Sequence, residues 1–225
     1  MSKVTNQKRS KRPVVLRGDL DPERLALHLT ACEDEALLAV DCEMMGLKLS
    51  RDRLCLVQMA DPDGNITLVQ IEPDQSDAPL LKKLLEDTDI TKVFHFGRAD
   101  LAIIAYQLGI NVFPIFCTKV ASKLARTYTE KHGLRDVTKE IIGLDLNKQQ
   151  QSSDWGRDKL TPEQIEYAAS DVVHLIRIKE GLTKMLEREE RLALAERCFQ
   201  HIPLLVELDI LDYNFIFEHH PPNKN

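Results

Sequence analysis

The strongest constraint in this sequence of 225 residues is a short apolar run that ends in two acids. Residues 37–40, Leu-Leu-Ala-Val, predict a buried strand, and Asp41 and Glu43 follow where that strand should end. Side chains two residues apart on a strand share a face, so both carboxylates point the same way. Like charges held this close repel and raise each other's pKa. The run therefore favours a sheet in which a cation lies between the two acids at a strand end.

The surrounding sequence predicts an α/β fold with a mixed sheet flanked by helices. The turn sequence Asp-Pro-Asp-Gly-Asn at residues 61–65 joins two apolar runs into a hairpin, which extends the first strand into an antiparallel meander. Later segments alternate between strand and helix patterns, as in a sheet with parallel strands. The expected strands cover residues 14–16, 36–43, 54–59, 66–70, 92–96 and 112–116, and the expected helices cover 21–32, 79–86, 99–108, 119–128 and 134–142.

A long helix is predicted from Thr161 towards Glu189. Thr161, Pro162 and Gln164 supply an N-cap, an N1 proline and a capping-box glutamine. Tyr167 and Asp171 are four residues apart, so they lie together on one helix face. Residues 192–217 alternate helix-like and apolar patches and predict a C-terminal helical extension.

Composition favours one domain over residues 13–225, preceded by a basic tail. Hydrophobic residues make up 43% of the chain, which is enough for a sizeable core. The first twelve residues contain five lysines and arginines without an acid, and we expect them to be disordered. A net charge of −6 argues against a broad basic surface for duplex nucleic acid. Five cysteines without a CxxC pair indicate reduced thiols in a cytoplasmic protein, and we expect no membrane or export segment.

Each acidic motif is weak evidence when it is taken alone. Asp41 and Glu43 could be solvated, Asp100 could simply favour the start of a helix, and Tyr167 with Asp171 could lie on an exposed helix face. Taken together and in order, the motifs resemble the tyrosine-type 3′–5′ exonucleases of the RNase D-like family, which have an RNase H-like fold. Glu166 occupies the position at which the sister group has a histidine.

Longer stretches strengthen this resemblance. Residues 51–55, 91–98, 116–119 and 148–155 are similar to the nanoRNase C group within the family. The resemblance implies a 3′–5′ exoribonuclease that hydrolyses short RNA oligonucleotides, down to dinucleotides, to 5′-mononucleotides. It also implies a homo-oligomeric ring, with an octamer as one candidate size.

The residue types fit a two-metal mechanism. Asp41, Glu43, Asp100 and Asp171 offer hard oxygen ligands, which suit Mg²⁺ or Mn²⁺ rather than zinc. Two ions about 3.5–4 Å apart would activate water and stabilise the leaving oxygen. Tyr167 has a reference pKa of about 10, so we expect it to orient the attacking water or the phosphate before acting as a base.

Substrate contacts are less well defined by the sequence. The resemblance makes Leu47 an apolar wedge between bases, and a buried loop leucine is an equal alternative. Arg98 adjoins a motif acid and is the best candidate for a phosphate contact, whereas Trp155 either borders the site or belongs to a segment that caps the Thr161 helix. His95 is interpreted as a strand residue. Further candidates are Lys119, Arg126 and Lys148 for phosphate, Gln150, Ser152 and Ser153 beside Trp155, and His132 and His174 without an assigned role.

Three alternatives stay open at this point. The same chemistry could trim longer RNA or DNA 3′ ends, and chain-length preference separates that activity from the first. A binding or scaffold module without catalysis is disfavoured, because all five motif residues are present. An unrelated α/β domain with a solvated acidic surface would require three coincidences in the right order.

Overall fold

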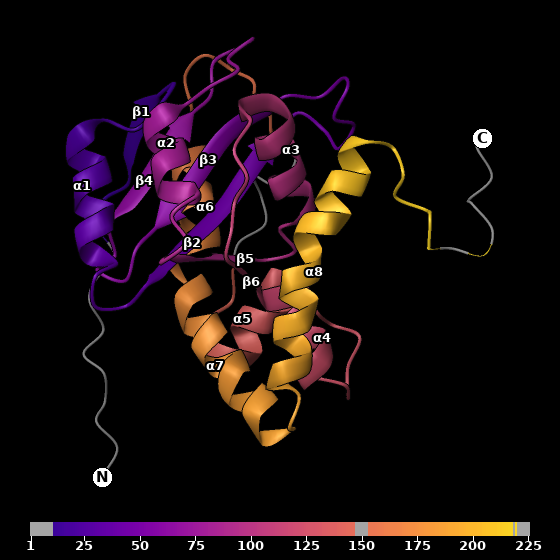
Figure 1. The fold of residues 1–225 in the computed structure, drawn as a ribbon. Helices are drawn as coiled ribbons and strands as arrows, with labels where there is room; N and C mark the ends of the chain where they lie inside the picture. The colour runs from indigo at the N-terminus through magenta and orange to yellow at the C-terminus, as the bar shows by residue number, and fades with distance from the viewer. Residues whose placement is uncertain (1–10, 147–152, 218, 220–225) are drawn as a thin grey trace.

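The computed structural model describes residues 11–146, 153–217 and 219, and it has the mixed sheet that the sequence predicts. The strand order is β1-β4-β3-β2-β5-β6 (Figure 1). Strands β2, β3 and β4 form an antiparallel meander, whereas β1 pairs with β4, and β5 with β2 and β6, in parallel. The strands are β1 (Val14–Arg17), β2 (Leu37–Met44), β3 (Leu54–Ala60), β4 (Ile66–Gln70), β5 (Thr91–Phe94) and β6 (Ile115–Cys117).

The predicted hairpin between β3 and β4 is held by Asp61. Its Oδ1 accepts hydrogen bonds from the backbone N–H groups of Asp63 and Asn65, each at 3.0 Å. Lys11, which the sequence places in the basic tail, also reaches this turn, because its backbone N–H donates to the Gly64 carbonyl at 3.0 Å. Residues 1–10 of that tail lie outside the described part of the chain.

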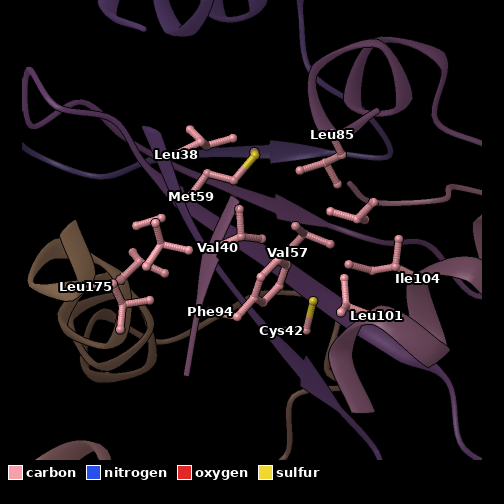
Figure 2. Close-up of a cluster of buried hydrophobic side chains, with 14 of the residues drawn as sticks. Leu38, Val40, Cys42, Val57, Met59, Leu85, Phe94, Leu101, Ile104 and Leu175 are labelled. Carbon is pink, nitrogen blue, oxygen red and sulfur yellow. The ribbon is translucent and has the colours of Figure 1, made fainter. Parts of the chain in front are cut away.

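The two faces of β2 have different partners. Leu38, Val40 and Cys42 point into a buried cluster with side chains from β3 and α3 (Figure 2). Asp41 and Glu43 alternate with them and point to the opposite face, where α6 (Pro162–Val173) packs against β2, β3 and β4. Helices α1 (Pro22–Ala31), α2 (Pro79–Leu85) and α3 (Arg98–Leu108) cover the first face. The acids therefore lie between the sheet and α6.

The prediction of one long helix from Thr161 towards Glu189 is wrong. The helix ends at Val173, and α7 (Leu175–Arg188) begins after a break at His174. Val172 is buried near the sheet, whereas α7 packs against α4 (Thr118–Ala125) and α5 (Leu134–Ile142). Two helical segments with different packing partners need different directions, and the break at His174 supplies them. The predicted cap is present, since Thr161 and Gln164 form a capping box.

The C-terminal part forms one helix, α8 (Leu192–Ile210), which contains Pro203 and packs against α3 and α4. No helix in the described part of the chain is both long and apolar enough to cross a membrane. All five cysteines lie in the described part and are free, and four of them are buried.

Candidate active site

Three carboxylates meet between β2 and α6. The pairing of β2 with β3 shifts between Glu43 and Met44, so a bulge lies beside the second acid. Bulges re-aim side chains at functional sites. Asp171, from the last part of α6, faces this strand end. Carboxylate oxygens of Asp41, Glu43 and Asp171 all lie within 4.8 Å of one another, a spacing that could hold a metal ion.

Asp100 reaches the same place from the start of α3. The chain turns sharply between β5 and α3, where Phe96 has a φ of 65°. A Cβ on Gly97 would lie 2.6 Å from the Cβ of Phe94, so only glycine allows the helix to begin this close to the strand. Asp100 is 8% exposed, and its carboxylate accepts hydrogen bonds from the backbone N–H groups of Asp100 itself and Cys42. After burial, the charge of Asp100 contributes most to raising the pKa of Asp41.

The four acids are electrostatically unfavourable as isolated anions. Burial, followed by the charges of Asp171 and Asp100, raises the pKa of Glu43 to about 9. Burial raises the pKa of Asp100 to about 7, against the two backbone N–H groups that lower it. The pKa of Asp41 is raised as well, by burial and then by the other three acids. Such a cluster must keep protons or receive a cation, and its hard oxygen donors fit Mg²⁺ or Mn²⁺.

Tyr167 lies one helical turn before Asp171 and is hydrogen-bonded to it. Burial and the surrounding acids raise the pKa of its phenol, so the hydroxyl keeps its proton. The Trp155 ring packs against the Tyr167 ring with centroids 6.0 Å apart.

Gln164 fixes the segment that carries Trp155, because its Nε2 donates to Ser153 Oγ and to the Asp154 carbonyl, each at 2.9 Å. Ser153 thus contacts the first turn of the Thr161 helix, whereas Lys148, Gln150 and Ser152 lie outside the described residues.

Leu47 is 79% exposed, so the alternative of a buried loop leucine is wrong. It lines a groove of about 870 Å³, whose lining includes none of the four acids but does include Met44 and Ala99, the chain neighbours of Glu43 and Asp100. The groove is bounded by the loop after β2, by the start of α3 and by residues 209–214 at the end of α8. Besides Leu47, its lining includes Met44, Lys48, Phe96, Arg98, Tyr106 and Asp209.

The sequence predicted several lysines and arginines to contact phosphate. Those in the described part of the chain already have protein partners. The Arg98 guanidinium donates to both carboxylate oxygens of Asp209, at 2.5 and 2.6 Å. Arg126 is 1% exposed, and its guanidinium pairs with the exposed carboxylate of Glu140. Lys119 Nζ lies 3.9 Å from the centroid of the Phe96 ring. Of these three residues, Arg98 is the one that lines the groove.

His95, which the sequence predicted to be a strand residue, and the two histidines left open all have structural contacts. His95 lies just after the end of β5, and its Nδ1 lies 2.8 Å from Thr118 Oγ1. His132 Nδ1 lies 2.9 Å from Ser122 Oγ. His174 occupies the break between α6 and α7, where burial lowers the pKa of its imidazole. None of them belongs to the metal-compatible group found among the described residues.

The sequence analysis missed two residues of this region. Gln58 on β3 donates from Nε2 to Asp41 Oδ2 at 2.9 Å. A signal was available, since Gln58 is a polar residue inside an otherwise apolar strand. Asp209, the partner of Arg98, lies 111 residues further along the chain and has no motif that marks it.

Comparisons with known proteins agree with this geometry. Residues 16–187 match a family model described as a 3′–5′ exonuclease. A ribonuclease D of Gluconacetobacter diazotrophicus is 35% identical over 158 residues, which are 70% of this chain and 40% of that protein. The chain thus spans less than half the length of this relative.

Two solved structures cover nearly the whole chain. Brucella melitensis NrnC bound to pGG is 45% identical with a TM-score of 0.85, over 94% of this chain and 100% of that one. Brucella melitensis NrnC with bound Mg²⁺ is 43% identical with a TM-score of 0.84, over 93% of this chain and 100% of that one. These similarities confirm the predicted exonuclease fold.

Proposed function

Because this chain belongs to the 3′–5′ exonuclease family, we propose that it is a metal-dependent exoribonuclease that hydrolyses short oligoribonucleotides, down to dinucleotides, to 5′-mononucleotides. The observation that carries the proposal is the convergence of four acids from three elements beside Tyr167. The similarity to Brucella melitensis NrnC also supports the proposal, because structures of that protein have been solved with pGG and with Mg²⁺.

Asp41, Glu43, Asp100 and Asp171 would hold two Mg²⁺ or Mn²⁺ ions. When bound, such ions supply an activated water and stabilise charge on the leaving oxygen. The raised pKa values of Asp41, Glu43 and Asp100 support this assignment, because a divalent cation would relieve the repulsion among these acids.

Tyr167 would act as a hydrogen-bond donor. Its raised pKa keeps the hydroxyl protonated near neutral pH, so it is suited to orient the attacking water or the scissile phosphate rather than to accept a proton. Trp155 packs against its ring and limits its movement. We therefore assign Trp155 to the support of Tyr167 at the edge of the substrate site.

The groove would hold the bases of the substrate. Leu47 is exposed at its rim and offers an apolar edge on which a base can pack, and Phe96 and Tyr106 add aromatic surface. Arg98 is neutralised by Asp209, so it would border the substrate without providing a free charge. A groove with few unpaired cations favours a short ligand over a long polyanion.

A homo-oligomeric ring would further restrict access to these sites. Exposed apolar residues on and after α8, among them Leu204, Leu211 and Phe217, support self-association, whereas Ile202 and Val206 on the same helix are buried within the chain. Light scattering after gel filtration measures the subunit number, and a monomer would remove the ring from the proposal. We place the activity in the cytoplasm, which the five free cysteines support.

The test is a time course with 5′-labelled RNAs of two, three, seven and about twenty nucleotides. Each is incubated with Mg²⁺, with Mn²⁺ and with chelator, and Asp41→Ala is the control for contaminating nucleases. Fast metal-dependent cleavage of the dinucleotide, with slow attack on the longest RNA, is expected. Efficient shortening of the longest RNA that stalls at a few nucleotides would instead indicate an exonuclease that trims longer RNA 3′ ends, and the dinucleotide activity would be refuted.

A further inference from the structure

Strand β3 contains a polar side chain that its surroundings do not favour. All seven residues of β3 are buried, and Gln58 is the only polar one among them, at 0% exposure. A buried amide costs free energy unless it forms hydrogen bonds, so an apolar residue would suit the core better. The question is which contact compensates for this cost.

The hydrogen bond of Gln58 is to a motif acid. Gln58 lies opposite Asp41 in the β2–β3 register, and its Nε2 donates to Asp41 Oδ2 at 2.9 Å. The other amide atom, Oε1, is buried without a hydrogen-bond partner in the described part of the chain. In the described part of the chain, the Gln58 side chain therefore hydrogen-bonds only to Asp41, through its amide nitrogen.

We propose that Gln58 is a positioning residue that orients the Asp41 carboxylate for a divalent cation. The proposal rests on the function proposed above, in which Asp41 is a metal ligand. The Asp41 carboxylate also accepts a hydrogen bond from the Cys42 backbone N–H, and the Gln58 amide donor fixes Oδ2, so the carboxylate no longer rotates freely to present either oxygen. Hydrogen-bond partners of metal ligands typically change metal affinity or activity by about 10–100-fold when they are removed.

The competing explanation is that Gln58 serves only the packing of the sheet. Gln58→Met separates the two explanations, since methionine has a similar length but donates no hydrogen bond to Asp41. Gln70→Met is a matched control on the neighbouring strand β4. Gln70 is also buried, at 6% exposure, but its Nε2 donates to the Arg157 carbonyl at 2.7 Å rather than to an acid.

The experiment titrates metal-free full-length protein with Mn²⁺ and follows the free ion by electron paramagnetic resonance. Relative to wild type, we expect about 10–100-fold weaker binding for Gln58→Met and unchanged binding for Gln70→Met. With a dinucleotide substrate, Gln58→Met should raise the Mg²⁺ concentration for half-maximal rate by a similar factor. Its kcat at saturating Mg²⁺ should stay within about threefold of wild type, because the acids themselves are intact.

Equal Mn²⁺ affinity of Gln58→Met and wild type would overturn the proposal. If Gln58→Met does not fold, Gln58→Asn serves instead, since it keeps the amide but is one methylene too short for the 2.9 Å contact. Retained affinity in that variant would equally overturn it. Failure of the wild-type protein to bind Mn²⁺ is a separate result, which would refute the metal site itself and not the role of Gln58 alone.

Discussion

The acid cluster and the groove both use residues of α3 but are stabilised in different ways. The acids come from β2, α3 and α6, they lie between the sheet and α6, and repulsion among them must be relieved by protons or cations. The groove is lined by a loop, by α3 and by the end of α8, and Leu47 on its rim is largely exposed. Its two helical walls are joined by the Arg98–Asp209 ion pair. The comparison teaches that turnover and substrate selection should be separable by mutation.

The largest effect is expected in the acid cluster. Asp41→Ala or Asp171→Ala should lower kcat/KM on a dinucleotide by roughly 10³-fold or more, since a metal ligand stabilises the transition state by several kcal/mol. The melting temperature of Asp171→Ala in chelator should stay equal or rise because a repelling charge is removed, whereas Asp41→Ala should gain less, since it also leaves the buried Gln58 amide unpaired. Asp34→Ala, at an exposed acid, is the control and should match wild type. Full activity of either ligand variant would refute the site assignment.

A smaller effect is expected for Tyr167→Phe. The variant keeps the ring that packs on Trp155 and loses only the hydroxyl, so kcat should fall by about 10–100-fold with KM nearly unchanged. Single-turnover and steady-state kinetics on the dinucleotide measure both constants. An increase confined to KM would mean that the hydroxyl binds substrate rather than assisting the reaction.

The groove should show an effect on selectivity instead. Asp209→Asn removes the charge that holds Arg98 and loosens α8 from α3. Because the Arg98–Asp209 pair is partly exposed, we expect only about a two- to fivefold loss in the preference for the dinucleotide over a 20-nucleotide RNA. Asp212→Asn, which changes another acid of the same groove, should leave that preference unaltered. An equal change in both variants would count against the role of the ion pair.

A separate effect concerns stability and pH in the absence of metal. Glu43 has an ordinary pKa of 4.5 and a folded pKa of about 9. Between these values the folded state binds more protons than the unfolded chain, so its stability falls as the pH rises. From pH 5 to pH 9 in chelator, we expect wild type to lose about 1–2 kcal/mol, or about 5 °C in melting temperature, relative to Glu43→Gln.

Saturating Mg²⁺ should reduce this difference, because the cation replaces the protons on the acids. Differential scanning calorimetry across the pH series tests both statements. Parallel melting curves of wild type and Glu43→Gln in chelator would show that Glu43 ionises normally in the folded protein.

Local patterns were sufficient for most elements of the fold. The apolar run before Asp41, the turn held by Asp61 and the capping box at Thr161 predicted β2, the β3–β4 hairpin and the start of α6. They succeed because these structures depend on neighbours within a few residues. The helix break at His174 was missed, since it depends on which elements α6 and α7 pack against.

The sequence by itself determined which side chains are available: four acids, a tyrosine one turn before the last acid, and a leucine after the first strand. Only the tertiary structure decided that Asp41, Glu43 and Asp171 meet within 4.8 Å, that Leu47 is exposed, and that Gln58 and Asp209 contact motif-region residues. The physical reason is distance along the chain. Periodicity and capping act over a few residues, whereas contacts between residues 17 to 130 apart depend on how the whole sheet and its helices pack.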